Sequence, residues 1–281
     1  MFGFNNYSKP GKGINKEDLN KSGVSLYFDI FFRRIWKMMA LNLMYLLVSI
    51  PAIVISILIS TYFLVSVVSL AGVDAVKNST LLGFLSLFFA IIFLQVTGSG
   101  PASVAKSYVL RKYVRDAHSW VVSDFFENIK SNFKQGIAVY IINTLVSAGL
   151  IFAYIFYSFI WKNSMGSALS IVIIIVAAIF VMMQMYVYQL VSSVKIKVKH
   201  IYIKALTLTV MKLPWNIVVL CMTFFLAYLM SYFALTSPAI CVVFVIALYF
   251  TLVCFTQIFM TNNVMNKYVI ESGKKTENEE Q

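Results

Sequence analysis

Residues of the types that catalysis uses gather in the longest polar segment of the sequence, residues 98–136. Asp116, His118 and Ser119 are the three residue types of a hydrolytic triad. A triad is assembled from parts of the chain that are distant in sequence, whereas these three residues are near neighbours. The chain also lacks the GxSxG motif that presents a nucleophilic serine. We therefore expect no catalytic residue and no enzymatic activity.

Two carboxylates in the same segment, Asp124 and Glu127, are three residues apart. A pair of acids can share general acid and base roles, but this spacing also marks the start of a helix with Asp124 as N-cap. We interpret residues 124–134 as such a helix. Its apolar face would hold Phe125, Phe126, Ile129 and Phe133. This face either packs on the bilayer or the inner ends of the spans, or docks another membrane protein.

The spacing of cysteines and histidines in the sequence matches no metal-binding or cofactor motif. Cys221, Cys241 and Cys254 lie in apolar segments, without a CxxC spacing or a nearby histidine. Neither His118 nor His200 has a second ligand at metal-binding spacing. We therefore expect buried structural thiols, no metal site and no cofactor.

The composition indicates that the chain lies in a membrane. Hydrophobic residues make up 60% of the 281 residues, charged residues only 12%, and the mean hydropathy is +0.83. The first apolar segment is longer than the ~30 Å hydrocarbon core requires, and Pro51 is its expected kink. We predict an all-α polytopic membrane protein with six transmembrane helices and amphipathic cytoplasmic helices, with spans at about 40–70, 81–99, 137–161, 168–194, 214–235 and 239–262.

The spans form a single membrane domain, residues 26–266, between two polar ends. Residues 1–25 are expected to be a flexible cytoplasmic tail, and residues 267–281 a disordered cytoplasmic tail. Residues 100–136 and 195–213 are interpreted as cytoplasmic loops.

The positions of lysine and arginine predict the orientation. Seven precede the first span, six lie in the central loop, five in residues 195–212 and three in the C-terminal tail, against only Lys77 and Lys162 opposite. By the positive-inside rule, both termini are cytoplasmic and the protein is a multi-pass protein of the cell membrane. The net charge of +12 lies beside apolar segments, so we expect contacts with anionic lipid headgroups and no nucleic acid.

The predicted spans contain amides but no Asp, Glu, Lys, Arg or His. Hydrogen bonding between helices is one explanation of the amides, and a row that binds solute is the other. A water-accessible cavity lined by Asn143, Gln184 or Gln257 would favour a carrier or channel for an uncharged solute such as a sugar. A bundle packed solid by Leu, Ile and Phe would count against it. The amides within or near the spans are Asn42, Gln95, Asn143, Gln184, Gln189 and Gln257.

The central segment contains a recognisable combination of residues: Gly100, Pro101, Ala102, 108–112 (YVLRK), Arg115, 123–125 (SDF) and 132–135 (NFKQ). This combination resembles the signature of the YesL-like family of integral membrane proteins of Gram-positive bacteria. The stretches 31–51 and 204–220 are similar to the family's opening and to its fifth-span entry. The resemblance implies no catalytic residues. By association with carbohydrate uptake, it implies an accessory or regulatory role beside a sugar permease or sensor kinase.

Our leading hypothesis is therefore a non-enzymatic accessory or regulatory membrane protein linked to carbohydrate uptake or sensing. Residues 26–39 would form a short helix in the headgroup plane, with its basic side chains in the phosphate layer. The central loop would contact lipid phosphates or an acidic partner. The candidate contacts are Arg33, Arg34, Lys37, Arg111, Lys112, Arg115, Phe125, Phe126, Ile129 and Phe133.

Overall fold

The computed structural model describes residues 23–71, 79–161, 163–194 and 196–270. Within these ranges every regular element is helical. The described residues separate into two units, one ending at Ile35 and the other beginning at Trp36. The predicted tails lie largely outside the described residues.

The first helix, α1 (Val24–Val48), continues through the predicted start of the first span at residue 40. Before residue 36 its aromatic side chains stack one turn apart, with the ring centroids of Tyr27 and Phe31 6.4 Å apart. The helix ends just before Ser49, and α2 (Ile50–Ala71) follows at once. The predicted single span is therefore two helices. The break falls beside Pro51, because proline has no N–H to continue the ladder of the preceding helix.

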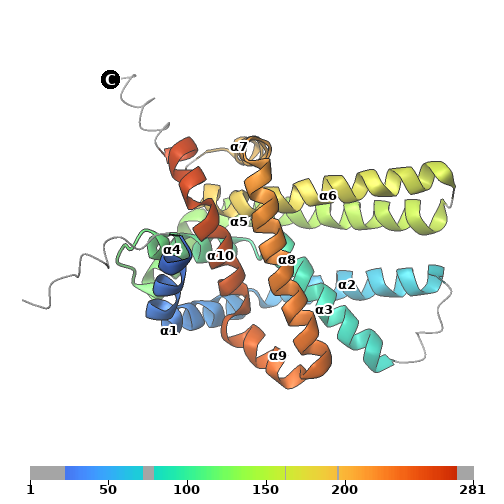
Figure 1. Ribbon diagram of the computed structural model, residues 1–281, viewed down its shortest axis with the longest axis horizontal. Helices are drawn as coiled ribbons and strands as arrows, with labels where there is room; N and C mark the ends of the chain where they lie inside the picture. Colours follow the sequence, from blue (N-terminus) through green and yellow to red (C-terminus); the bar gives the residue numbers. More distant parts are fainter. Residues whose placement is uncertain (1–22, 72–78, 162, 195, 271–281) are drawn as a thin grey trace, which may run out of the picture. The chain divides into compact units, whose positions relative to one another are not determined.

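Two antiparallel hairpins lie beside each other in Figure 1. α2 pairs with α3 (Ser79–Thr97), and α5 (Val121–Ile155) pairs with α6 (Ser164–Val191) through the π-helical turn η3 (Phe156–Ile160). Most apolar side chains of α2, α5 and α6 remain exposed or half-buried along these hairpins, as expected for helices that face lipid.

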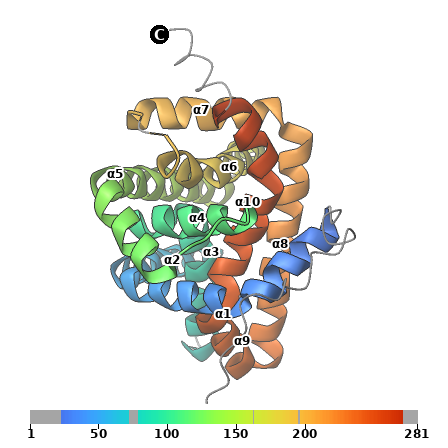
Figure 2. The same cartoon turned by 90° about the vertical axis from the view of Figure 1, so that its left-hand side faces the viewer.

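Residues 100–136, which we interpreted as a cytoplasmic loop, are largely helical. The first part of this segment is α4 (Pro101–Val114), which is buried along nearly its whole length against α5, α6 and α10 (Figure 2). Gly136 permits the close approach of α4 and α5, because a Cβ there would lie 2.7 Å from the Pro101 nitrogen. The rest of the loop belongs to α5, whose backbone is non-helical only at Asn132 (φ −113, ψ 15).

The last third of the chain crosses the α5–α6 hairpin in Figures 1 and 2. The predicted loop 195–213 holds a helix, α7, and the sixth predicted span is interrupted by a π-helical turn, η4. The elements are α7 (Val198–Met211), α8 (Leu213–Thr236), α9 (Pro238–Phe244), η4 (Val245–Tyr249), α10 (Phe250–Met265) and η5 (Asn266–Ile270).

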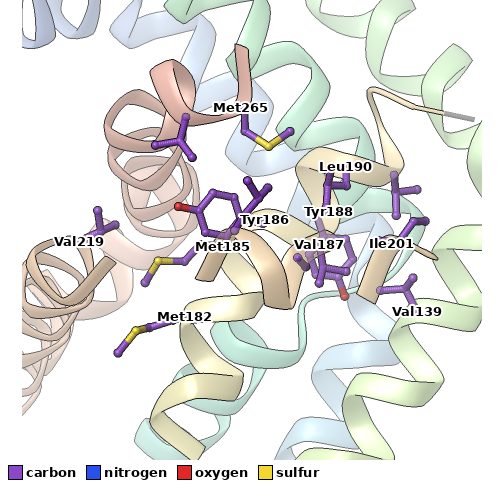
Figure 3. Close-up of a cluster of buried hydrophobic side chains, with 14 of the residues drawn as sticks. Val139, Met182, Met185, Tyr186, Val187, Tyr188, Leu190, Ile201, Val219 and Met265 are labelled. Atoms are coloured by element: carbon purple, nitrogen blue, oxygen red, sulfur yellow. The ribbon is translucent and has the colours of Figure 1, made fainter. Parts of the chain in front are cut away.

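A cluster of buried side chains joins these helices to α6 (Figure 3). α6 supplies the largest share, since its last ten residues include aliphatic, sulfur-containing and aromatic side chains that pack against several neighbours. Thioether and aromatic side chains suit such an irregular space because they adapt their shape. The members labelled in Figure 3 are Val139, Met182, Met185, Tyr186, Val187, Tyr188, Leu190, Ile201, Val219 and Met265.

The chain is an all-α polytopic membrane protein, as predicted. Five described helical stretches are long and apolar enough to cross a bilayer: Ile50–Leu70, Val121–Ile160, Ser164–Val191, Leu213–Ala234 and Pro238–Tyr268. The second predicted span, 81–99, coincides largely with α3, of whose side chains the structure describes only a part. Its crossing stays a prediction.

The buried side-chain amide of Asn42 in α1 forms hydrogen bonds with backbone groups in and next to the π-helical turn η4. Its Nδ2 donates to the carbonyls of Val245 and Ile246 at 2.9 and 2.7 Å, and its Oδ1 accepts from the Thr251 N–H at 3.0 Å. Non-helical backbone persists at membrane depth only where protein groups satisfy it. Asn42 is fully buried and supplies all three bonds.

We predict that Asn42→Leu destabilises the protein. The change leaves backbone groups at η4 without partners, and each buried unpaired group costs roughly 1–3 kcal/mol. Thermal unfolding in detergent micelles measures the effect. Asn263→Leu, at an exposed asparagine of α10, is the matched control and is expected to leave the melting temperature nearly unchanged. Equal melting temperatures for both variants would contradict the role of Asn42.

Candidate functional site

A cavity of about 60 Å³ lies within the helical bundle, beside α4. Its lining comes from helices that are distant in sequence, and it mixes a lysine, four glutamines and hydroxyl groups with apolar side chains. The lining residues are Tyr45, Gln95, Val96, Gly98, Ser103, Lys106, Ser107, Val181, Gln184, Met185, Tyr188, Gln189, Thr223, Cys254, Gln257 and Ile258.

Lys106 places a positive charge at this cavity. Its side chain is only 4% exposed, and its Nζ lies 3.5 Å from the centroid of the Tyr45 ring. Its one protein hydrogen bond among the described residues is a long one, to the Phe250 carbonyl at 3.4 Å. The lining contains no aspartate or glutamate. The ammonium is thus held by ring faces and a carbonyl, and no described carboxylate neutralises it.

Two glutamines at the cavity, Gln184 and Gln189, donate hydrogen bonds through their side-chain nitrogens, whereas their side-chain oxygens have no described partner. Gln184 Nε2 donates to Asn143 Oδ1 at 3.1 Å, and Gln189 Nε2 donates to Met185 O and to Thr261 Oγ1. These donors orient the amides. The Oε1 atoms of both, and of Gln95, are buried without a hydrogen-bond partner in the described protein. The cavity lining is therefore rich in free acceptors.

Asn143, behind the cavity, organises a polar network. Its Oδ1 accepts from Gln184 and also from the Tyr202 hydroxyl at 2.6 Å, while its Nδ2 contacts the Tyr188 hydroxyl at 3.3 Å. Tyr188 in turn donates to the Thr97 carbonyl at the end of α3. The left-handed Gly98 (φ +73) makes room for this ring, because a Cβ would lie 2.5 Å from the Tyr188 hydroxyl. The network holds α3, α5, α6 and α7 around the site.

A second buried cation of α4, Arg111, has a different role. Its Nη1 donates to the Gln189 carbonyl near the end of α6 at 3.2 Å. Burial, followed by repulsion from Arg115, lowers the pKa of Arg111 to about 10. The guanidinium therefore remains protonated at neutral pH, where it favours the negative end of the α6 dipole.

The basic residues predicted to contact lipid or a partner are placed in different surroundings. Arg33, Lys37 and Arg115 are exposed and Arg34 is half-buried, whereas Arg111 is buried and does not reach the surface. Arg115 donates to Asn266 Oδ1.

The Lys112 ammonium is bound to Asp124 Oδ1 at 2.9 Å. Partial burial acts to lower the pKa of Lys112, but this hydrogen bond and the nearby carboxylate charge raise it on balance. Asp124 is not the N-cap that we predicted. α5 begins one turn earlier, at Val121, and the Asp124 carboxylate also accepts from Ser119 at 2.7 Å.

The predicted apolar face of the loop helix is divided. Phe125 is fully buried, Ile129 half-buried, and Phe126 and Phe133 exposed. Ile129 and Phe133 border an open groove between the start of α5 and the α6–α7 connection. Its lining also includes Asn128, Lys130, Ser131, Asn132, Lys134, Gln135, Val191, Ser192, Ser193, Val194, Ile196 and Lys197.

Our sequence reasoning missed Lys106, because it assigned residues 100–136 to the cytoplasm as a whole. One signal could have found it: before Lys106, α4 contains only small or apolar residues, PASVA, and serines flank the lysine at 103 and 107 on one helical face. Of the cysteines, Cys241 and Cys254 are buried as predicted, whereas Cys221 is exposed.

Fold and site together define a polytopic helical membrane protein with a positively charged polar cavity in its bundle. Residues 80–155 match the family described as "Protein of unknown function, DUF624". The matched segment covers α4, α5 and nearly all of α3, and includes Gln95, Lys106 and Asn143. No curated protein and no solved structure matches the chain.

We predict that Lys106→Met leaves stability unchanged or raises it. A buried ammonium loses several kcal/mol of hydration, which the cation–π contact of about 2 kcal/mol and one long hydrogen bond do not restore. Arg111→Met is the matched comparison, and loss of its bond to α6 should cost about 1.5–3 kcal/mol. Chemical or thermal unfolding in micelles compares the two. A large loss of stability in Lys106→Met would show that the lysine is structural.

Proposed function

We propose that the protein binds a small polar solute in the cavity beside Lys106 and acts as a carrier or channel for it. The observation that supports this proposal is the cavity itself, lined by Gln184 and Gln257, two of the three amides whose exposure to a cavity we took as the criterion. In a purely structural amide network, the side-chain oxygens would accept hydrogen bonds from other protein groups. Three of the glutamine oxygens here have no described protein partner.

The setting of the cavity also supports a role in binding. Ionisable residues inside membrane proteins are costly and mark solute or ion pathways by default. A cavity of about 60 Å³ is large enough for roughly four to six waters, or for a solute of similar size. The non-enzymatic character of the protein is part of the same proposal.

We predict saturable binding of at least one member of a panel of short solutes: glycerol, glycolamide, glycolate, lactate and glucose. Gln184→Leu and Gln257→Leu should each weaken it about fivefold, the equivalent of one hydrogen bond of about 1 kcal/mol. Gln135→Leu is the matched control, because that amide binds the Ile196 carbonyl, away from the cavity. Equilibrium dialysis of the purified protein measures binding, and uptake into liposomes measures transport.

Two results would count against this function. If no panel member bound, or if the Gln184 and Gln257 variants bound as the wild type does, the cavity would not be a solute site. Binding without uptake would contradict the carrier and favour a protein that senses its solute.

A second candidate is the accessory or regulatory role beside a sugar permease or sensor kinase. The groove next to Ile129 and Phe133 favours it, since two exposed lysines, Lys130 and Lys134, lie beside apolar side chains on its wall. Such a mixed surface suits an acidic partner or anionic lipid. The match of residues 80–155 agrees with the YesL-like resemblance, from which the link to carbohydrate uptake is taken.

The proposed orientation puts this groove and both termini in the cytoplasm of a cell whose plasma membrane holds the protein. The distribution of lysine and arginine supports it.

One set of variants tests orientation and docking together. In a background without native cysteines, a cysteine at the exposed Phe126 should react with a membrane-impermeant maleimide in inverted vesicles and not in intact cells. A photo-crosslinker on the same cysteine should then capture a sugar permease or sensor kinase. A crosslinker at exposed Ile171 of α6 is the control. Labelling in intact cells would refute the orientation, and capture of the same proteins from both positions would refute docking at the groove.

A further inference from the structure

We infer that the solute is a small hydroxycarboxylate, with its carboxylate on Lys106 and its hydroxyl group on the glutamine oxygens. This inference rests on the proposed solute-binding function and names the chemical class of the solute. The three properties of the cavity that lead to it are its charge, its hydrogen-bonding character and its size.

The positive charge at the cavity favours an anionic solute. Lys106 is 4% exposed and has no described carboxylate partner, and the lining contains no acidic residue. The cavity also lies beside the first turns of α4, whose N-terminal dipole adds positive potential near Ser103. An anionic group beside the ammonium would form the ion pair that the protein itself does not supply.

The uncharged part of the lining favours a solute with a hydroxyl group, because it offers hydrogen-bond acceptors. The side-chain nitrogens of Gln184 and Gln189 donate to Asn143, Met185 and Thr261, which orients the amides, and their Oε1 atoms, without a described partner, can only accept hydrogen bonds. A carboxylate alone has no hydrogen to donate to them. A hydroxyl group on the same molecule donates one, and it satisfies a buried acceptor that would otherwise remain unpaired.

The size of the cavity limits the molecule. A volume of about 60 Å³ corresponds to roughly four to six waters, which excludes an intact hexose in this conformation. Glycolate and lactate have about this size, and each joins one carboxylate to one hydroxyl group. They are therefore the probes of choice, compared with glycolamide, which lacks the charge, and acetate, which lacks the hydroxyl group.

Binding of these four compounds to the purified full-length protein tests the inference. We expect glycolate or lactate to bind at least about tenfold more tightly than glycolamide, and Lys106→Met to remove that preference, since charged hydrogen bonds are worth a factor of this order. Lys106→Arg should retain part of it. Gln184→Leu should weaken glycolate more than acetate. Lys112→Met is the matched control, because that ammonium pairs with Asp124 outside the cavity lining.

The outcomes separate this inference from the function on which it rests. Equal binding of glycolamide and glycolate, unchanged in Lys106→Met, would overturn the inference and leave solute binding intact. Binding of acetate or chloride as tight as that of glycolate would overturn the role of the hydroxyl group. If none of the four compounds and no other member of the panel bound, both proposals would fall.

Discussion

The burial of α4 is the constraint on which the rest of the structure depends. A helix with two cations loses their hydration when it is buried, and only contacts with its neighbours can offset part of that cost. Arg111 finds the carbonyl end of α6, and Lys106 finds the ring of Tyr45 and the Phe250 carbonyl. α1, α6 and α10 must therefore meet around α4. The cavity lies beside Lys106, where the surrounding helices leave a space that no described side chain fills.

A second feature of the structure is that buried side-chain amides form hydrogen bonds with backbone groups where helices are irregular or end. Asn42 satisfies the groups around η4, and Asn216 donates to the carbonyls of Leu208 and Thr209 at the end of α7. Both side chains are fully buried and both act between helices. Inside a bilayer no water can bond such backbone groups, so at these two places a neighbouring amide supplies the hydrogen bonds. Asn42 and Asn216 thus satisfy backbone groups, whereas Gln95, Gln184, Gln189 and Gln257 line the cavity.

The sequence was sufficient to predict the long apolar helices, because the length and hydropathy of a span are local properties. It was also sufficient for the break beside Pro51, where the missing N–H is a property of a single residue. The burial of α4 could not be predicted from local properties of the sequence. Lys106 and Arg111 carry the same charge as surface lysines and arginines, and only their contacts with distant residues such as Gln189 and Phe250 make them interior groups.

The candidate site was predictable only in part for the same reason. Gln184 and Gln257 could be named as amides of spans, but whether an amide bonds a helix or faces a cavity depends on packing between elements. Phe125 and Phe126 are adjacent on one predicted apolar face, yet one is fully buried and the other exposed. A periodic pattern identifies a face, whereas the neighbour that covers it is set by the tertiary fold.

The placement of Asn42 and Tyr45 on α1 has a mechanical consequence. The two residues are three apart, on the same side of one helix, and both belong to the unit that begins at Trp36. One supports η4 and the start of α10, and the other contacts the ammonium of Lys106. A molecule that entered the cavity and displaced the Tyr45 ring would therefore act on the same helical turn that supports the start of α10. One turn of α1 thus connects the cavity with the irregular backbone around η4.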